Sequence, residues 1–307
     1  MKIVRFIENN VSLVLLLGVP LGLILPFFAP LKWSLKYILM FVLFVSFVKI
    51  DFQEVFFYLK RPFLPLYVSG MNMFVAPVLV FFALSLLTND KSMVSAMLLL
   101  AAVPSGVAST AMSDLMGADG SLTLIITIFS HFIAPFSIPF LFYALMRKVV
   151  HINYLGISLT MGELILVPLV LAYIAKRFYG DSAFVQFLFR RNKSLTAVPI
   201  SFISLIVISI NAHFIYEYPL EVLKYLAVAY AVYYFFIFFG LLEVPKMDGK
   251  RRMAISNSKT FMNVSIGIVL AIQFFDPKTA LIITLSQIPW PTMFPQVNFV
   301  MKKLHLK

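Results

Sequence analysis

Long apolar runs alternate with short polar connections along the chain. A helix needs about 20 mostly apolar residues to cross the hydrocarbon core of a bilayer, and ten runs approach or meet this length. They lie near residues 11–29, 34–50, 65–87, 93–116, 120–146, 153–176, 194–212, 219–242, 252–275 and 277–300. None of them shows the strict alternation that is typical of a transmembrane β-barrel strand. The pattern therefore predicts an all-α integral membrane protein with ten transmembrane helices.

The composition agrees with this prediction. Of the 307 residues, 61% are hydrophobic and 12% are charged, whereas a soluble domain carries about 25% charged residues. This balance excludes soluble enzymes, nucleic-acid binders and secreted disulfide scaffolds. The absence of cysteine removes disulfides and thiolate sites. The basic first segment is not followed by a cleavage motif, so we expect a retained first helix and not a signal peptide.

The net charge of +12 belongs to the loops. Most of the 25 Lys and Arg residues fall on one side of ten alternating spans, with clusters at 176–177, 190–193, 246–252 and 302–307. Because cytoplasmic loops of membrane proteins carry an excess of Lys and Arg, we expect both termini in the cytoplasm. We expect a plasma-membrane location and no nucleic-acid partner.

The basic connection at 177–193 divides the chain into two halves of five spans. Five is odd, so the second half enters the membrane in the opposite orientation, as in the inverted repeats of many secondary carriers. We predict a single transporter domain over 1–307, with one repeat at 1–150 and the other at 151–307. The fourth span of each half contains a polar stretch, V-P-S-G-V-A-S-T at 103–110 and A-I-S-N-S-K-T-F-M-N-V-S at 254–265. Interrupted helices at matching positions point to a binding site at the membrane midplane.

Hydroxyl side chains gather beside the first of these stretches. Pro104 has no N–H and Gly106 relaxes the backbone, so we expect the helix to break there. The candidate ligands for a substrate or cation are Ser105, Ser109 and Thr110 beside the break, and Thr123 and Thr127 on one face of the next span. Helix packing alone is the alternative role for these hydroxyls. His131 on the same face is a candidate proton site, or a buried histidine with satisfied hydrogen bonds.

Lys259 lies well inside the ninth span, with no acid close to it in the sequence. A charge at that depth costs roughly 2.5–3.5 kcal/mol and is retained where it is paired or used. Glu163, in the middle of the sixth span, is its predicted charge partner. Snorkelling of Lys259 to the cytoplasmic interface is the alternative. Asn72 and Asn263 are further polar candidates within spans.

Three segments resemble motifs of the bile acid:sodium symporter family, within the wider group of bile-acid, arsenite and auxin-type carriers. P-S-G-V-A-S-T (104–110) resembles P-G-G-x-x-S-N, S-D-L-M-G-A-D-G-S-L-T-L-I-I-T (113–127) resembles the loop and hydroxyl pattern after it, and S-K-T-F-M-N (258–263) resembles E-x-G-x-Q-N. The resemblance covers all ten spans in layout. It implies a core of spans 65–146 and 219–300, where the fourth and ninth helices cross at their breaks. It also implies a panel of spans 11–50 and 153–212, with the substrate bound between core and panel.

The resemblance implies one sodium site formed by Ser109, Thr110, Thr123 and Thr127. The family's ninth-span glutamate falls on Ser258, or on Lys259 if the register slips by one, so the site is degenerate. Loss of its negative ligand removes a large favourable electrostatic contribution. We therefore expect altered or absent sodium coupling, with Lys259 replacing the ion, and no other cofactor.

These observations favour a secondary active transporter of a small organic anion that works by alternating access. Lys259 and a helix N-terminus at the break both present positive potential, which favours an anion. An auxin-type or other efflux carrier of the same group is the alternative. A polytopic membrane enzyme is less favoured, because His131, Glu163 and Lys259 come from three spans and form no catalytic motif. The expected partners are the anion and the lipid bilayer.

Overall fold

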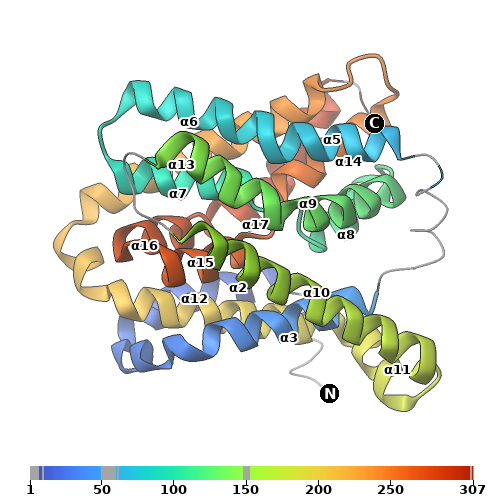
Figure 1. Cartoon of the computed structure of the whole chain (residues 1–307), viewed down its shortest axis with the longest axis horizontal. Coiled ribbons are helices and arrows are strands. Elements are labelled where there is room, and N and C mark those ends of the chain that lie inside the picture. Colours follow the sequence, from blue (N-terminus) through green and yellow to red (C-terminus); the bar gives the residue numbers. More distant parts are fainter. Residues whose placement is uncertain are drawn as a thin grey trace. The chain divides into compact units, whose positions relative to one another are not determined.

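The computed structural model describes residues 7–8, 10–49, 60, 62–147, 153–304 and 306, and only the backbone of Val11 and Ser12 (Figure 1). Within these residues every regular element is a helix and no strand occurs. Six helical stretches in the described part are long and apolar enough to cross a membrane: Pro26–Phe47, Phe63–Leu87, Gly120–Met146, Tyr154–Tyr179, Asn192–Glu217 and Pro219–Leu242. The prediction of an all-α membrane protein is confirmed. The basic residues Lys2 and Arg5 and the expected repeat boundary at 150/151 lie outside the described residues.

The chain divides into two compact units. Unit 1 comprises Met1–Phe52 and Thr160–Val222. Its helices are α2 (Val11–Ile24), the 3₁₀-helix η1 (Pro26–Ser34), α3 (Leu35–Phe47), most of α10 (Tyr154–Tyr179), α11 (Ala183–Arg190) and α12 (Asn192–Glu217). Helix α12 packs closely along α2. The approach is so close that a side chain at Gly18 would collide with the Ser201 carbonyl.

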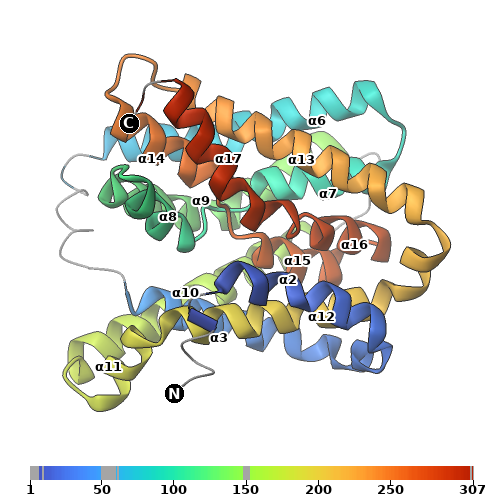
Figure 2. The ribbon, with the colours of Figure 1, turned by 180° about the vertical axis from the view of Figure 1, so that it is seen from behind.

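Unit 2 comprises Gln53–Leu159 and Leu223–Lys307. Its helices, seen from both sides in Figures 1 and 2, are α5 (Phe63–Gly70), the π-helical turn η2 (Met71–Val75), α6 (Ala76–Leu87), α7 (Lys91–Ala102), α8 (Ala108–Met116), α9 (Gly120–Met146), most of α13 (Pro219–Leu242), α14 (Gly249–Thr260), α15 (Val264–Phe274), α16 (Pro277–Leu285) and α17 (Pro289–Lys303). Helix α7 and most of α15 are buried on all sides, which explains their apolar character around the whole circumference.

Two interruptions define the centre of unit 2. Helix α7 ends at Ala102 and α8 begins at Ala108, whereas α14 ends at Thr260 and α15 begins at Val264. The helix breaks that the sequence predicts in its fourth and ninth spans are thus confirmed. These breaks shorten the affected helices, so α7 and α15 are too short to count among the six spanning stretches.

The two interruptions meet each other. The amide of Gly106 donates to the Phe261 carbonyl at 2.9 Å, and the amide of Asn263 donates to the Pro104 carbonyl at 2.8 Å. Between them Ser105 and Met262 form an isolated antiparallel bridge. Backbone groups that a break releases are costly in an apolar environment unless they find partners. Here each break supplies the partners of the other.

Candidate functional site

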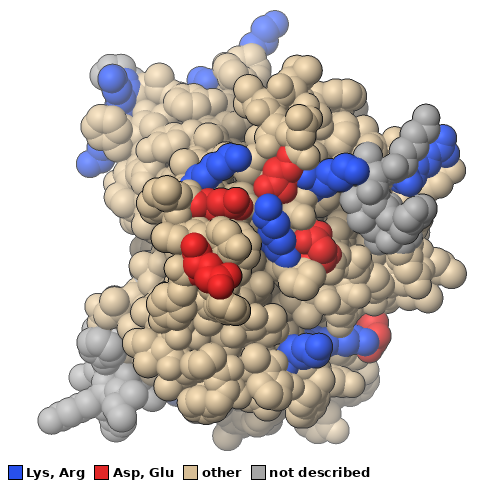
Figure 3. Space-filling view, turned by 90° about the vertical axis from the view of Figure 1, so that its left-hand side faces the viewer, with Lys and Arg blue, Asp and Glu red and all other residues tan. Residues whose placement is uncertain are grey.

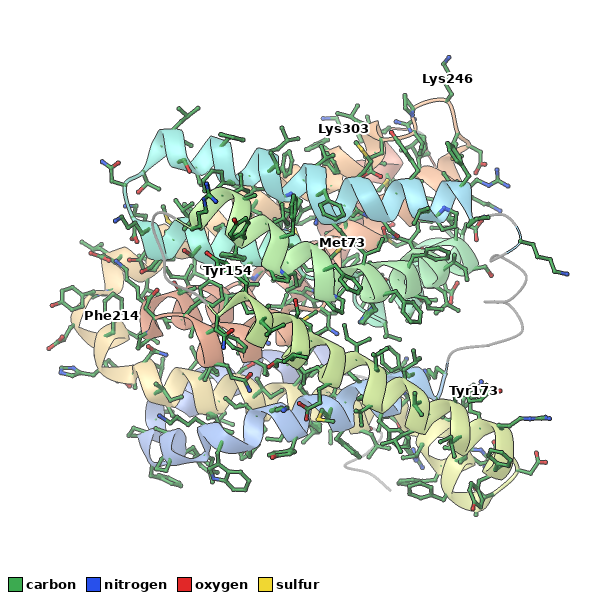
Figure 4. The ribbon with its side chains drawn as sticks, in the orientation of Figure 1. Met73, Tyr154, Tyr173, Phe214, Lys246 and Lys303 are labelled. Carbon is green, nitrogen blue, oxygen red and sulfur yellow. The ribbon has the colours of Figure 1, made fainter. Side chains whose placement is uncertain are left out.

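Buried polar side chains surround the crossing of the two breaks in unit 2. They come from the segment after α7, from α8 and α9, and from α14, which contacts both α8 and α9 (Figure 2). The π-helical turn η2 contributes a further polar residue, the buried Asn72. Its neighbour Met73, labelled in Figure 4, is buried as well. Segments far apart in the sequence thus share one polar centre.

Three hydroxyl groups form the first cluster of this centre. Ser105 Oγ lies 3.0 Å from Ser109 Oγ, and Thr127 Oγ1 lies 2.9 Å from Ser105 Oγ and 3.3 Å from Ser109 Oγ. All three residues are buried. Ser109 also donates to the Gly106 carbonyl at 2.6 Å. The structure therefore brings together the hydroxyls that the sequence selected on either side of the loop between α8 and α9.

A second cluster joins α8, α9 and α14. Ser113 Oγ lies 2.8 Å from Thr123 Oγ1, and Asn257 Nδ2 donates to Ser113 Oγ at 3.1 Å. Asn257 lies in the polar stretch of the ninth span but is not among the site residues predicted from the sequence. Its Oδ1 and the Oγ1 of Thr110 are buried and have no hydrogen-bond partner among the described residues. Both atoms are thus neutral acceptors whose hydrogen-bonding capacity is unused in the described part of the chain.

Lys259 is held inside unit 2, with 2% of its surface exposed. Its Nζ donates to the carbonyl of Asn72 at 2.8 Å and to the carbonyl of Ala101 at 2.5 Å. The ammonium also lies 4.8 Å from the centre of the Phe236 ring, within cation–π range. The snorkelling alternative is wrong, because the side chain turns towards these interior acceptors.

Two prolines explain why those carbonyls are available. In a regular helix the Ala101 carbonyl would accept from the amide of Ser105, but after Pro104 that amide donates to Ser130 Oγ at 3.1 Å instead. The carbonyl of Asn72 is free because the amide of Ala76 binds Met71 and the next residue, Pro77, has no N–H. A cation is further favoured at the C-terminal end of α7 by the helix dipole.

The remaining predicted residues of unit 2 take the following places. Asn72 Nδ2 donates to Ser258 Oγ at 3.3 Å, so the candidate at the position of the family's glutamate lies against η2. Asn263 lies in the second break and contributes its amide to the crossing. Nδ1 of buried His131 lies 2.8 Å from the Thr127 carbonyl. With a carbonyl as its partner, this nitrogen carries the proton.

Glu163 has a different partner from the predicted one. Its Oε2 pairs with Nζ of Lys36 at 2.5 Å, within unit 1. The expected pair with Lys259 is corrected accordingly, because the carboxylate is engaged by Lys36 and the ammonium of Lys259 by main-chain carbonyls. Glu163 and Lys36 are far apart in the sequence, so their pairing has no local signal.

Glu243, the residue directly after α13, is not among the site residues predicted from the sequence. Both of its carboxylate oxygens are buried and have no hydrogen-bond partner in the described part of the chain. Its charge interacts with that of Lys259. The available signal was an acid at the very end of the eighth apolar run, outside the middle of the spans where the other candidates lie.

An integral membrane protein whose buried polar centre lies at two facing helix breaks has the features of a secondary carrier. The family model of the Sodium Bile acid symporter family matches residues 36–218, which is more than half of the chain. The protein therefore belongs to this family of membrane transporters. The matched range includes the hydroxyl clusters on α8 and α9 and ends before α14. No curated protein matches the chain.

Proposed function

We propose that the protein is a secondary active transporter that moves a small organic anion without sodium coupling. Its family membership supports transport across a membrane. The observation that carries the sodium-independent part is the position of the Lys259 ammonium, between carbonyls released at two helix irregularities. A resident ammonium in such a place supplies the positive charge that an entering cation would otherwise bring.

The hydroxyl clusters provide no negatively charged ligand for sodium. Ser109, Thr123 and Thr127 provide neutral oxygens, which already hydrogen-bond to one another or to carbonyls. The fourth hydroxyl, Thr110 Oγ1, has no such partner among the described residues, but it is neutral as well. Ser258, at the position of the family's glutamate, donates to the Ile255 carbonyl at 2.7 Å and supplies no negative charge. At a separation of roughly 10 Å a second positive charge costs about 1.7 kcal/mol at an effective dielectric constant of about 20. Sodium binding is therefore disfavoured, whereas an anion is attracted.

The architecture that we propose has ten spans in two inverted repeats, with a core and a panel that alternate access to the site. The division into two compact units supports it, because each unit combines one segment from the first half of the chain with one from the second half. The proposed substrate and ion site consists of Asn72, Ser105, Ser109, Thr110, Thr123, Thr127, Ser258, Lys259 and Asn263. The charge distribution of the loops supports cytoplasmic termini in the plasma membrane.

Uptake into liposomes tests the proposal. Purified protein is reconstituted, and uptake of radiolabelled cholate and indole-3-acetate is measured in sodium, potassium or choline buffers. We expect uptake of at least one of these organic anions at the same rate in all three buffers. Lys259→Ala should abolish it, whereas Lys224→Ala, which removes an exposed lysine of α13, should not. A steep requirement for sodium would overturn the proposal.

A further inference from the structure

Glu243 continues the face of α13 that packs on α14. Its amide donates to the Phe239 carbonyl at 3.1 Å, so it extends the helical turn. Phe236, Gly240 and Glu243 are spaced by four and three residues, which places them on one helical face. The carboxylate is therefore directed to the same neighbour as the Phe236 ring.

The packing of α13 on α14 is close at the middle of this face. A side chain on Gly240 would come within 2.5 Å of the Ser256 Cα atom, and Ser256 Oγ donates to the Ile237 carbonyl at 2.9 Å. One turn further along α14, the Lys259 ammonium lies over Phe236. Seven residues separate Phe236 from Glu243, which is about 10 Å of helix. A buried acid and a buried ammonium thus lie along one helix interface, and their charges interact.

Other charged groups near this end of unit 2 have partners of their own or point away. Arg252 of α14 donates twice to the Leu241 carbonyl, at 3.2 Å each. Asp248 caps α14 and pairs with Arg251, and Asp119 caps α9 by accepting from the amide of Leu122. Lys246 extends away from the helices in Figure 4, and Lys302 and Lys303 are exposed in the last turn of α17. Arg252 keeps its charge, but the charge that opposes the rise in the pKa of Glu243 is that of Lys259.

Burial raises the pKa of Glu243, which follows the last residue of its span, to about 8, and the charge of Lys259 opposes this rise. The carboxyl group is consequently protonated in the lower part of the physiological range and ionised above it. When Glu243 is ionised, its charge offsets that of Lys259. When it is protonated, the polar centre keeps a net positive charge.

We propose that Glu243 is a proton-binding site that couples binding of the organic anion to binding of a proton. The inference rests on the proposed function, in which Lys259 attracts the anion. Uptake of one proton converts the Glu243 carboxylate into the neutral acid, so the anion then meets an uncompensated ammonium. Coupling between two sites is reciprocal, and the anion in turn favours the protonated acid. The carrier therefore moves proton and anion in the same direction.

Anion binding measured against pH tests this coupling. The affinity of the reconstituted protein for cholate and indole-3-acetate is determined by calorimetry between about pH 6 and about pH 9, with and without sodium. We expect affinity to fall on the order of tenfold as pH rises, which is the effect of one charge at roughly 10 Å. Glu243→Gln, which is permanently neutral, should show a clearly smaller fall in affinity than the wild type. The matched control Glu217→Gln, at an exposed acid on α12, should behave like the wild type.

A ligand-independent readout complements this assay. Infrared spectra of the protein without ligand should contain a protonated carboxyl band that titrates near neutral pH and is absent in Glu243→Gln. Lys259→Met should shift its midpoint upwards, because the stabilising ammonium is gone. A pH response of undiminished size in Glu243→Gln, or the absence of the titrating band in the wild type, would overturn the coupling. A requirement for sodium with the band intact would overturn the proposed function and leave Glu243 as a titrating site.

Discussion

The two helix breaks of unit 2 pair with each other but arise by different means. In the first break Pro104 removes an amide and Gly106 allows the close approach of Phe261. The second break, at 261–263, contains neither proline nor glycine. There Trp290 Nε1 donates to the Met262 carbonyl at 3.1 Å, and the amide of Asn263 is taken up by Pro104. The first interruption is encoded locally, whereas the second depends on partners from elsewhere in the chain.

The chemistry of the two breaks differs as well. Neutral hydroxyls such as that of Ser109 line the first break. Beside the second break, the last turn of α14 contains the charged residue Lys259. The Lys259 ammonium donates to the Ala101 carbonyl at the end of α7. The second half of the chain therefore supplies a donor for a carbonyl that the first break leaves without one. Two helix breaks that pair with each other can therefore have different electrostatic surroundings.

Removal of Lys259 should have the largest effect on this arrangement. Lys259→Ala leaves the buried carbonyls of Asn72 and Ala101 without their donor, and each unsatisfied group costs about 1–3 kcal/mol. We expect a loss of roughly 2–4 kcal/mol in the free energy of unfolding, measured by thermal denaturation in detergent. Lys224→Ala serves as the control. Unchanged stability of Lys259→Ala would show that water replaces the ammonium and that the carbonyl pair is not structurally important.

A side chain at Gly106 should disturb the crossing itself. A Cβ atom there would lie 2.7 Å from the Phe261 carbonyl oxygen and 3.2 Å from that of Met262. We expect Gly106→Ala to destabilise the protein by about 2 kcal/mol, as overpacking does. Gly162→Ala in α10, where the added atom meets nothing within 4 Å, should be neutral or slightly stabilising. Equal melting temperatures for both variants would contradict the close approach of the breaks.

Loss of the Trp290 donor should weaken the second break by a smaller amount. Trp290→Phe retains an aromatic ring beside Phe261 and removes the hydrogen bond to the Met262 carbonyl, which costs about 1 kcal/mol. Faster hydrogen exchange of the amides at 261–264 is the readout. Trp33→Phe, at an exposed tryptophan of η1, should leave that exchange unchanged. Protection that is unaltered in Trp290→Phe would mean that the crossing holds the second break without this bond.

The N-terminal end of α7, which begins at Lys91, differs from the C-terminal end at the first break because a side chain of the same chain segment caps it. Acidic and basic side chains lie close together on the face shown in Figure 3. Asp90 caps α7 by accepting from the amide of Met93, and it pairs with Lys278 at 3.1 Å. Burial opposes its ionisation, but the hydrogen bond from Met93 and the charge of Lys278 together lower the pKa of Asp90.

Asp90→Asn should therefore have the smallest effect, about 0.5 kcal/mol, because Asn preserves the cap and only the partly exposed ion pair is lost. Since the pKa is lowered on folding, this stability is present above the unfolded pKa of about 3.9 and is lost as pH falls through the folded pKa. The difference in melting temperature between wild type and variant should disappear in acid. A difference that persists there would assign the effect to the cap and not to the charge.

Several features of the fold and the site follow from local sequence. The positions of the apolar runs predict the helices, and Pro104 with Gly106 predicts the first break. The hydroxyls at 123 and 127 are four residues apart on one helix, so helical periodicity alone places them on one face. For these features the deciding interactions lie within a few residues of each other, and a sequence records them directly.

The partners of the charged groups were decided by the tertiary structure. In each of these interactions, turns, breaks or whole helices separate the two partners along the chain. The interactions are those of Lys36 with Glu163, of Glu243 with Lys259, and of Lys259 with two main-chain carbonyls. The acceptors of Lys259 carry no side-chain signature at all, because any residue has a carbonyl. The sequence by itself determined where the helices run and where the first one breaks. Which charge meets which acceptor was decided only by packing, because electrostatic interactions depend on distance in space and not on distance along the chain.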